Sequence, residues 1–231
     1  MENTFRVTAC TIGTNRYQWF DKLSAEEKKL LDDHSVKITY KKGEIICKQG
    51  GFVSQIMYLE DGLAKVFLND GSNSLVIKIV CGGNFLGLAS LSEDFNTYQY
   101  SVQTYIDSEI TQIDLKIFRQ LLSRNAAFAK EVIDIIAANS VQMYGRFFCL
   151  TNKQSYGRLA DIILCLSERV FKTSEFNLPL SRKDLAELSG MSQETVIRIL
   201  KKFNEEGLIE MNGKNFKVID FERMQRISET G

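Results

Sequence analysis

The chain has 231 residues, 44% of them hydrophobic, which suffices for one large domain or two modest ones with cores of their own. Its 29 basic and 29 acidic side chains balance, so no strongly basic surface indicates a nucleic-acid partner. No apolar run is long enough to cross a bilayer and the polar N-terminus lacks a secretory leader, so we expect a cytoplasmic protein without a membrane partner.

The cysteine and histidine content argues against a metal or a cofactor. The five cysteines are scattered and form no CxxC pair, which favours reduced thiols and argues against zinc. An iron–sulfur cluster needs four gathered thiolates, and the N-terminal third supplies only Cys10 and Cys47. The single histidine, His34, ends an expected surface helix and is a poor candidate for a haem ligand. The scattered cysteines are still compatible with a redox switch at a single thiol.

The N-terminal half predicts a short helix and then a β-rich domain. Ser24 and Glu27 form a capping box that opens a helix ending near Asp33. Short β-prone runs then alternate with glycine turns such as Asp61-Gly62. These runs span residues 36–40, 44–47, 55–59, 64–68, 75–80, 98–104 and 109–113. Many short strands separated by glycine turns indicate an antiparallel β-roll of the jelly-roll kind.

A long helix with two apolar stripes follows, beginning near Ala126 after a short helix over residues 115–122. One stripe comprises Phe128, Val132, Ile135, Asn139, Met143, Arg146 and Leu150, and a second comprises Ala129, Ile133, Ile136, Ser140 and Phe147. Two adjacent apolar faces need two partners, one of which can be the chain's own roll. We assign the first stripe to the same helix of a second subunit, with Asn139 as a polar register mark. An intramolecular bundle is the alternative.

Residues 179–207, PLSRKDLAELSGMSQETVIRILKKFNEEG, predict two short helices joined by a tight turn. Before them we expect a hinge over residues 151–155 and an amphipathic helix over residues 156–171. Ser181 is placed to cap the first helix of the pair, with Asp184 three residues on. Gly190 can take the left-handed conformation that ends this helix, and Ser192 caps the second.

The second helix of the pair has one inward and one outward face. Apolar residues at three- and four-residue spacing face inward, namely Val196, Ile199, Leu200 and Phe203. The outer face is left with Gln193, Glu194, Ile197, Arg198 and Lys201. Amide, carboxylate and guanidinium groups at the start of a well-anchored helix suit the reading of base edges in a major groove. An ordinary helical hairpin with solvated charges is the alternative.

Two short β-prone runs, over residues 208–211 and 216–219, flank a turn that contains Asn212-Gly213. Two helices followed by such a hairpin form a winged helix-turn-helix, in which Lys214 and Lys217 are expected to contact phosphates. From residue 153 onward there are 13 basic and 12 acidic side chains, so any DNA affinity depends on where the charges lie. We therefore predict an α+β chain with a sensor roll (1–125), a long dimerisation helix with its hinge (126–152) and a winged helix-turn-helix (153–231).

This order of a glycine-punctuated roll, a long helix and a winged helix-turn-helix resembles the Crp/Fnr superfamily of bacterial transcription regulators, from about residue 20 to residue 220. Ser192–Leu200, SQETVIRIL, is similar to the family's recognition helix, and Phe85-Leu86-Gly87 is similar to part of its roll. The resemblance implies a homodimer on double-stranded DNA, with a TGA-like element in each half of a palindrome. It also implies RNA polymerase as a partner.

By this resemblance, Glu194 and Arg198 occupy two base-reading positions that are widely shared in the family. Gln193 stands where cyclic-AMP-type members have a further arginine, and Ile197 stands where Fnr-type members have serine, so the flanking bases should differ from those of both subfamilies. The simpler alternative for Glu194 is stabilisation of the helix N-terminus. Contacts to phosphates are expected from Ser192, Thr195, Lys201, Lys214 and Lys217.

The resemblance also places a candidate effector pocket at Gly87, Leu88, Tyr98, Gln99 and Tyr100. Cyclic-nucleotide-binding members have a carboxylate and an Arg-Ser pair where this chain has Leu88, Tyr98 and Gln99. A buried phosphate without a cation is very costly, so we expect no cyclic AMP. A hydrophobic or aromatic small molecule, or no ligand, fits these residues better, and plain roll core is the alternative.

Two other classes of protein are the alternatives to a DNA-binding regulator. A cupin-type enzyme would use the roll as a metal site, but such enzymes gather two or three histidines on the metal and this chain has one. The sequence shows no nucleophile–base pair either, so we do not expect an enzyme. A protein–protein adaptor that uses the winged helix is the third interpretation.

Overall fold

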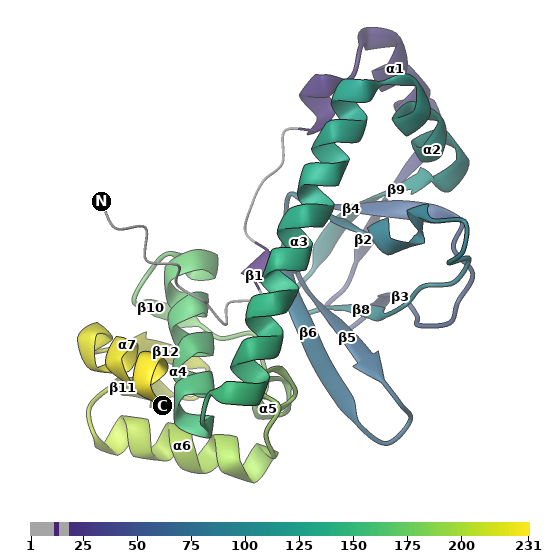
Figure 1. Ribbon diagram of the computed structural model, residues 1–231. Coiled ribbons are helices and arrows are strands. Elements are labelled where there is room, and N and C mark those ends of the chain that lie inside the picture. Colours follow the sequence, from purple (N-terminus) through teal and green to yellow (C-terminus); the bar gives the residue numbers. More distant parts are fainter. Residues whose placement is uncertain (1–11, 14–18) are drawn as a thin grey trace. The chain divides into compact units, whose positions relative to one another are not determined.

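The computed structural model of the chain describes residues 12–13 and 19–231 (Figure 1). The described residues form two compact units, each with its own core. One unit comprises residue 13 and residues 19–73 and 79–140, and the other comprises residue 12 and residues 74–78 and 141–231. The long helix α3 (Ala126–Asn152) has its first part in one unit and its last part in the other. No helix among the described residues is both long and apolar enough to span a bilayer.

Two β-sheets build the expected roll. One sheet has the strand order β2-β9-β4-β7, formed by Ser35–Tyr40, Ser108–Asp114, Gln55–Asp61 and Asn84–Leu86. The other has the order β1-β6-β5-β8-β3, formed by Ile12–Gly13, Ser74–Cys81, Leu63–Asn69, Ser101–Thr104 and Ile45–Cys47. The register of β4 against β9 pairs Ile56 with Ile113 and Leu59 with Ile110. Side chains alternate between the two faces along a strand, so Ile56 and Ile113 point to one face of this sheet, and Leu59 and Ile110 point to the other. All four are fully buried, so both faces of the sheet are covered.

The roll differs from the sequence prediction at three strands, and the first is β1, which was not expected. The short strand β7 was not expected, and the expected run over residues 98–104 is a strand only from Ser101. The backbone of Tyr98 exchanges hydrogen bonds with a separate loop, because its N–H donates to Gly51 O at 2.9 Å and its carbonyl accepts from Gly50 N at 2.8 Å. The chain at Tyr98 therefore leaves the ladder that β8 forms with β3 and β5.

An aromatic cluster holds the helices against the roll. Helices η1 (Trp19–Lys22), α1 (Ala25–Asp33) and α2 (Leu115–Arg124) surround this cluster together with the start of α3. The ring centroids of Trp19 and Phe85 are 4.8 Å apart, those of Phe85 and Phe118 are 5.5 Å apart, and those of Phe118 and Phe128 are 5.3 Å apart. Such edge-to-face chains add to the burial energy of the rings.

The first apolar stripe of α3 packs inside the chain itself. Phe128, Val132 and Ile135 are at most 2% exposed in the core of the N-terminal unit, so the prediction that they face a second subunit is wrong. Arg146 is buried as well, and its guanidinium donates to the carbonyl of Leu188. Of the remaining predicted seam residues, Asn139 and Leu150 are half-buried and Met143 is exposed.

The second apolar stripe is the one that the fold leaves uncovered. Ile133 is 63% exposed and Phe147 is 71% exposed, and Ile136 is exposed as well. Both stripes are apolar, and only the position of the roll's aromatic rings decides which one faces inward.

The C-terminal unit is a helical domain with a three-stranded sheet. It contains α4 (Ser155–Cys165), a π-helical turn η3 (Leu166–Phe171), α5 (Arg182–Ser189), α6 (Gln193–Glu205) and α7 (Phe221–Thr230). The strands are β10 (Glu175–Asn177), β12 (Asn215–Val218) and β11 (Ile209–Asn212), in that order. The expected hairpin is confirmed, and β10 is an unexpected third strand. The helix expected over residues 156–171 is α only as far as Cys165.

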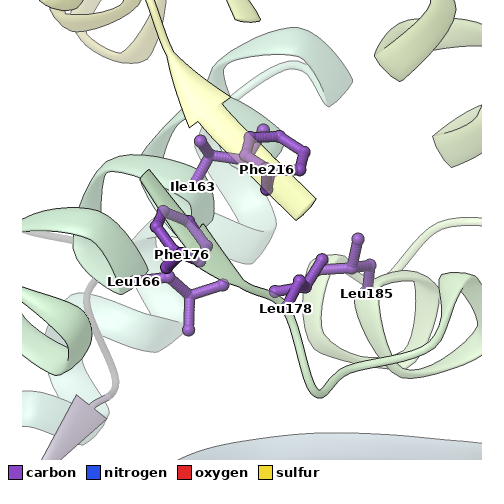
Figure 2. A pocket seen from close by; sticks show the side chains of 6 residues that line it. All are labelled: Ile163, Leu166, Phe176, Leu178, Leu185 and Phe216. Carbon is purple, nitrogen blue, oxygen red and sulfur yellow. The ribbon is translucent and has the colours of Figure 1, made fainter. Parts of the chain in front are cut away.

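Six apolar side chains meet where α4, the sheet and α5 join (Figure 2). They surround a small pocket and are Ile163, Leu166, Phe176, Leu178, Leu185 and Phe216. The rings of Phe176 and Phe216 stack at 5.6 Å between centroids. No polar side chain lines this pocket, so it serves as the core that sets α5 against the sheet.

A buried ion pair ties the end of α3 to α4 and α7. Lys153 Nζ lies 2.5 Å from Asp161 Oδ2 and donates to Ser228 O at 2.5 Å, and both charged side chains are 13% exposed. Burial raises the pKa of Asp161, although the hydrogen bond from Lys153 acts to lower it. The cost of removing both charges from water therefore offsets much of the attraction between them. The pair fixes the position of the end of α3 more than it adds to stability.

We predict that Asp161→Ala destabilises the C-terminal unit by about 3–5 kcal/mol, because it leaves the Lys153 ammonium buried without its counter-ion. The double variant Lys153→Met/Asp161→Leu should recover most of this loss. Urea denaturation measures both. The control is Asp134→Ala, which breaks the exposed Lys130–Asp134 pair and should cost less than about 1 kcal/mol. Equal losses in Asp161→Ala and Asp134→Ala would contradict the prediction.

Candidate nucleic-acid interface

Helix α5 and the turn after it are fixed by local hydrogen bonds. Ser181 Oγ accepts from Asp184 N at 3.1 Å, and Asp184 Oδ2 accepts from Ser181 N at 2.9 Å, so the expected capping box is confirmed. Gly190 has φ of +62°, the left-handed conformation expected at the end of this helix. Leu185 and Leu188 are each 1% exposed and anchor α5.

Helix α6 begins at a second cap and is anchored along its whole inner face. Ser192 Oγ accepts from Thr195 N at 3.2 Å, as expected for an N-cap. The four predicted inner residues, Val196, Ile199, Leu200 and Phe203, are at most 1% exposed. Burial of each side chain is worth about 1.5–3 kcal/mol, so the rotation of α6 about its axis is firmly set. In Figure 1, α6 runs along one edge of the C-terminal unit.

The outer face of α6 carries the predicted base-reading side chains in exposed positions. Gln193, Glu194, Ile197 and Arg198 are all exposed. The side chains of Gln193 and Arg198 make no hydrogen bond or ion pair with any residue that the structure describes. The pKa of Glu194 is lowered by its own backbone N–H and by the Ser192 hydroxyl, which are the donors at the helix start. Its carboxylate is therefore ionised at neutral pH, at the helix end where a negative charge is stabilised.

The predicted phosphate contacts lie around this helix and on the wing. Lys201 is exposed and lies 3.6 Å from Glu205 on the same helix. Lys214 is exposed in the turn between β11 and β12. Lys217 Nζ lies 3.7 Å from a carboxylate oxygen of Glu175 in β10. An exposed pair of this kind is worth little and does not hold Lys217 away from another anion.

Sequence reasoning missed one cation beside the wing. Arg182, in the first turn of α5, is half-buried and lies 3.6 Å from Met211 Sδ in β11. Burial lowers the pKa of its guanidinium, which still stays charged at neutral pH. The sequence signal was its place directly after the cap residue, where backbone N–H groups favour anions.

In the roll, two tyrosines fill the region of the candidate effector pocket. Gly87 N donates to the Tyr100 hydroxyl at 2.8 Å, and the Tyr98 hydroxyl donates to Gln55 O at 3.1 Å. Gly87 has φ of +89°, and a Cβ there would meet Tyr98 Cε1 at 3.5 Å. Burial raises the pKa of both tyrosines to about 12, so both hydroxyls stay protonated at neutral pH.

The other two predicted pocket residues lie in different surroundings. Leu88 is 6% exposed and belongs to the aromatic core cluster. Gln99 is exposed, and its amide nitrogen donates to Thr97 O at 2.9 Å. The positions of Leu88 and the two tyrosines are consistent with the alternative interpretation, in which these residues are structural parts of the roll and do not bind an effector.

The described thiols and the histidine show no sign of a metal centre or a reactive nucleophile. Among the residues that the structure describes, no three metal-ligating side chains form a group that could hold an ion. Burial raises the pKa of Cys47 to about 12 and that of Cys149 to about 11, so both are thiols at neutral pH. Cys165 is disulfide-bonded, so the expectation of reduced thiols is wrong at this position. Cys10 lies outside the described residues.

Two protein-family models match two separate parts of the chain. The Crp-like helix-turn-helix domain matches residues 157–227, and the cyclic nucleotide-binding domain matches residues 37–125. The first match covers α4 to α7, including the exposed face of α6, and the second covers the roll. The chain is therefore a DNA-binding transcription regulator with an N-terminal sensor domain.

The chain is similar to known transcription regulators in sequence and to a solved structure in fold. It is 24% identical over 185 residues to the transcriptional activator protein FnrA of Stutzerimonas stutzeri, covering 78% of this chain and 75% of FnrA. It is 25% identical over 190 residues to the cAMP-activated global transcriptional regulator CRP of Escherichia coli O6:H1, covering 78% and 87%. A crystal structure of a crp/fnr family regulator from Eubacterium rectale matches with a TM-score of 0.78 at 17% identity, covering 94% and 100%. The chain belongs to the Crp/Fnr family of transcription regulators.

Proposed function

We propose that the chain binds a palindromic DNA site as a homodimer and reads bases with Gln193, Glu194, Ile197 and Arg198. The observation that carries this proposal is the pair of Glu194 and Arg198, exposed together on a helix whose inner face is fully buried. The guanidinium can donate two hydrogen bonds to guanine, and the ionised carboxylate can accept one from the cytosine amino group. A TGA-like element in each half-site fits these two readers.

The phosphate contacts in this proposal come from both ends of the reading surface. Ser192 and Thr195 lie at the positive end of α6, where the Ser192 hydroxyl donates to Thr195 Oγ1 and the Thr195 N–H donates to Ser192 Oγ. The Thr195 hydroxyl is then the donor that can reach a phosphate at this end of the helix. Lys201 follows two turns later on the helix, and the wing contributes Lys214 and Lys217. These cations give affinity and orientation without sequence preference. Contact with RNA polymerase is a further expectation for a regulator of this family.

We infer that the dimer seam runs along the exposed stripe of α3. Ile133, Ile136, Ser140, Met143 and Phe147 follow one another at alternating three- and four-residue spacing, the pattern of a coiled-coil seam. Four of them are exposed apolar side chains, which favours burial against a second copy. Of the seam predicted from the sequence, only Met143 is part of this proposed seam. The other four residues come from the second stripe of α3.

We infer further that the roll does not take a cyclic nucleotide. Leu88, Tyr98 and Gln99 offer no cation or carboxylate for a cyclic phosphate and its ribose, and the two tyrosine hydroxyls already bond to the backbone there. An aromatic effector that displaces these tyrosines, or no effector, fits the roll better.

Arg198→Ala should cost about 1–3 kcal/mol at one symmetric base position and abolish the preference there. The measurement is selection from random duplexes followed by titration of single-base variants of the selected site. Arg226→Ala is the control, since Arg226 is an exposed arginine of α7 that pairs with its neighbour Glu222. If both variants leave the base preferences intact, the assignment of Arg198 as a reader is wrong.

Phe147→Glu should raise the dimer dissociation constant at least about a hundredfold, because two like charges would face each other in the seam. Sedimentation equilibrium measures this constant. The control Val36→Glu alters an exposed apolar residue on strand β2 and should leave the dimer unchanged. A dimer that survives Phe147→Glu undiminished would rule out this seam.

Isothermal titration of the full chain with cyclic AMP should give no saturable heat, because the pocket lacks a partner for the buried phosphate. The same titration with a DNA duplex that carries the selected site serves as a positive control for folded protein. A saturable isotherm for cyclic AMP would overturn this inference.

A further inference from the structure

One residue on the outer face of α6 has no polar atom to offer. Ile197 is 48% exposed, whereas the other large apolar side chains of α6 are at most 1% exposed. Its neighbours on the outer face are an amide, a carboxylate and a guanidinium. A large apolar side chain held in water on a helix surface forgoes the burial that stabilises its counterparts on the inner face.

The position of Ile197 ties it to the base readers. It follows Glu194 by three residues and directly precedes Arg198, so all three side chains lie on the same side of the helix. The side chain is branched at Cβ and therefore stiff in a helix, so its methyl groups are held in a defined place. The buried face of α6 fixes that place relative to the rest of the domain.

The chemistry of the major groove offers such a side chain one specific partner. Of the groups that distinguish the base pairs there, the C5-methyl of thymine is the large apolar one, and the others are hydrogen-bond donors or acceptors. A side chain without donors or acceptors cannot satisfy those polar groups. It gains contact only where a methyl group faces it.

We propose that Ile197 reads the methyl group of a thymine in each half-site, beside the base pair that Arg198 reads. This inference rests on the proposed DNA-binding function and names the base that the apolar position selects. Burial of one methyl group is worth roughly a fourfold change in affinity, so two symmetric half-sites give about tenfold or more.

Replacement of thymine by deoxyuridine tests the proposal, because it removes the methyl and leaves the hydrogen-bonding groups unchanged. With the full-length chain, a site selected from random duplexes is substituted at one symmetric thymine pair at a time. Fluorescence anisotropy then measures the dissociation constant. We expect about a tenfold loss at one symmetric position and less than about twofold elsewhere.

The variant Ile197→Ser should bind the thymine and deoxyuridine sites with equal affinity, within about twofold. The matched control is Ile219→Ser, since Ile219 is 50% exposed in the same unit and lies outside α6. The control should keep the full sensitivity to deoxyuridine. Circular dichroism melting of both variants shows whether each is folded.

The outcomes separate the reading of thymine by Ile197 from the DNA-binding function on which it rests. If a palindrome is selected and Arg198→Ala relaxes it, but no deoxyuridine substitution weakens binding, the thymine assignment fails and the DNA-reading function stands. The thymine assignment also fails if folded Ile197→Ser keeps the tenfold loss. If no sequence is selected at all, the proposed function fails together with the thymine assignment.

Discussion

The burial of one face of α6 is the constraint on which the reading surface depends. Side chains on a helix are coupled through the backbone, so the positions of Val196, Ile199 and Phe203 in the core also set the directions of Glu194 and Arg198. Each buried side chain is worth about 1.5–3 kcal/mol, against a total stability of about 5–15 kcal/mol for a typical domain. The helix therefore cannot rotate to adapt to DNA without giving up a large share of the folding energy. The proposed base-reading side chains therefore keep fixed directions relative to the rest of the domain.

The start of α6 places two demands on the same groups. Ser192 caps the helix, and Glu194 accepts from the donors at that end, which keeps its carboxylate ionised. An ionised carboxylate accepts hydrogen bonds and cannot donate them, so it suits the amino group of cytosine and rejects base edges that present only acceptors. Near phosphates the same negative charge is repelled. In the proposed complex the phosphate contacts are therefore assigned to cations away from Glu194, such as Lys201 and Lys214.

Local signals in the sequence predicted this part of the chain well, because each depends on a few neighbouring residues. The cap at Ser181, the left-handed Gly190 and the inner face of α6 are examples. Contacts distant in sequence were not predictable in the same way. Strand β10 has three residues and exists through its pairing with β12, forty residues later. The two stripes of α3 were equally apolar, and the rings around Phe128 that decide between them come from separate segments of the chain.

The roll sets a chemical condition on any effector it could bind. The N–H of Gly87 donates to the Tyr100 hydroxyl, and the Tyr98 hydroxyl donates to Gln55 O, so the backbone groups lining this region are already satisfied. A ligand that moves the tyrosines leaves a buried N–H and a buried carbonyl unpaired, at a cost of about 1–3 kcal/mol each. It must therefore supply both an acceptor and a donor on a flat, largely apolar body.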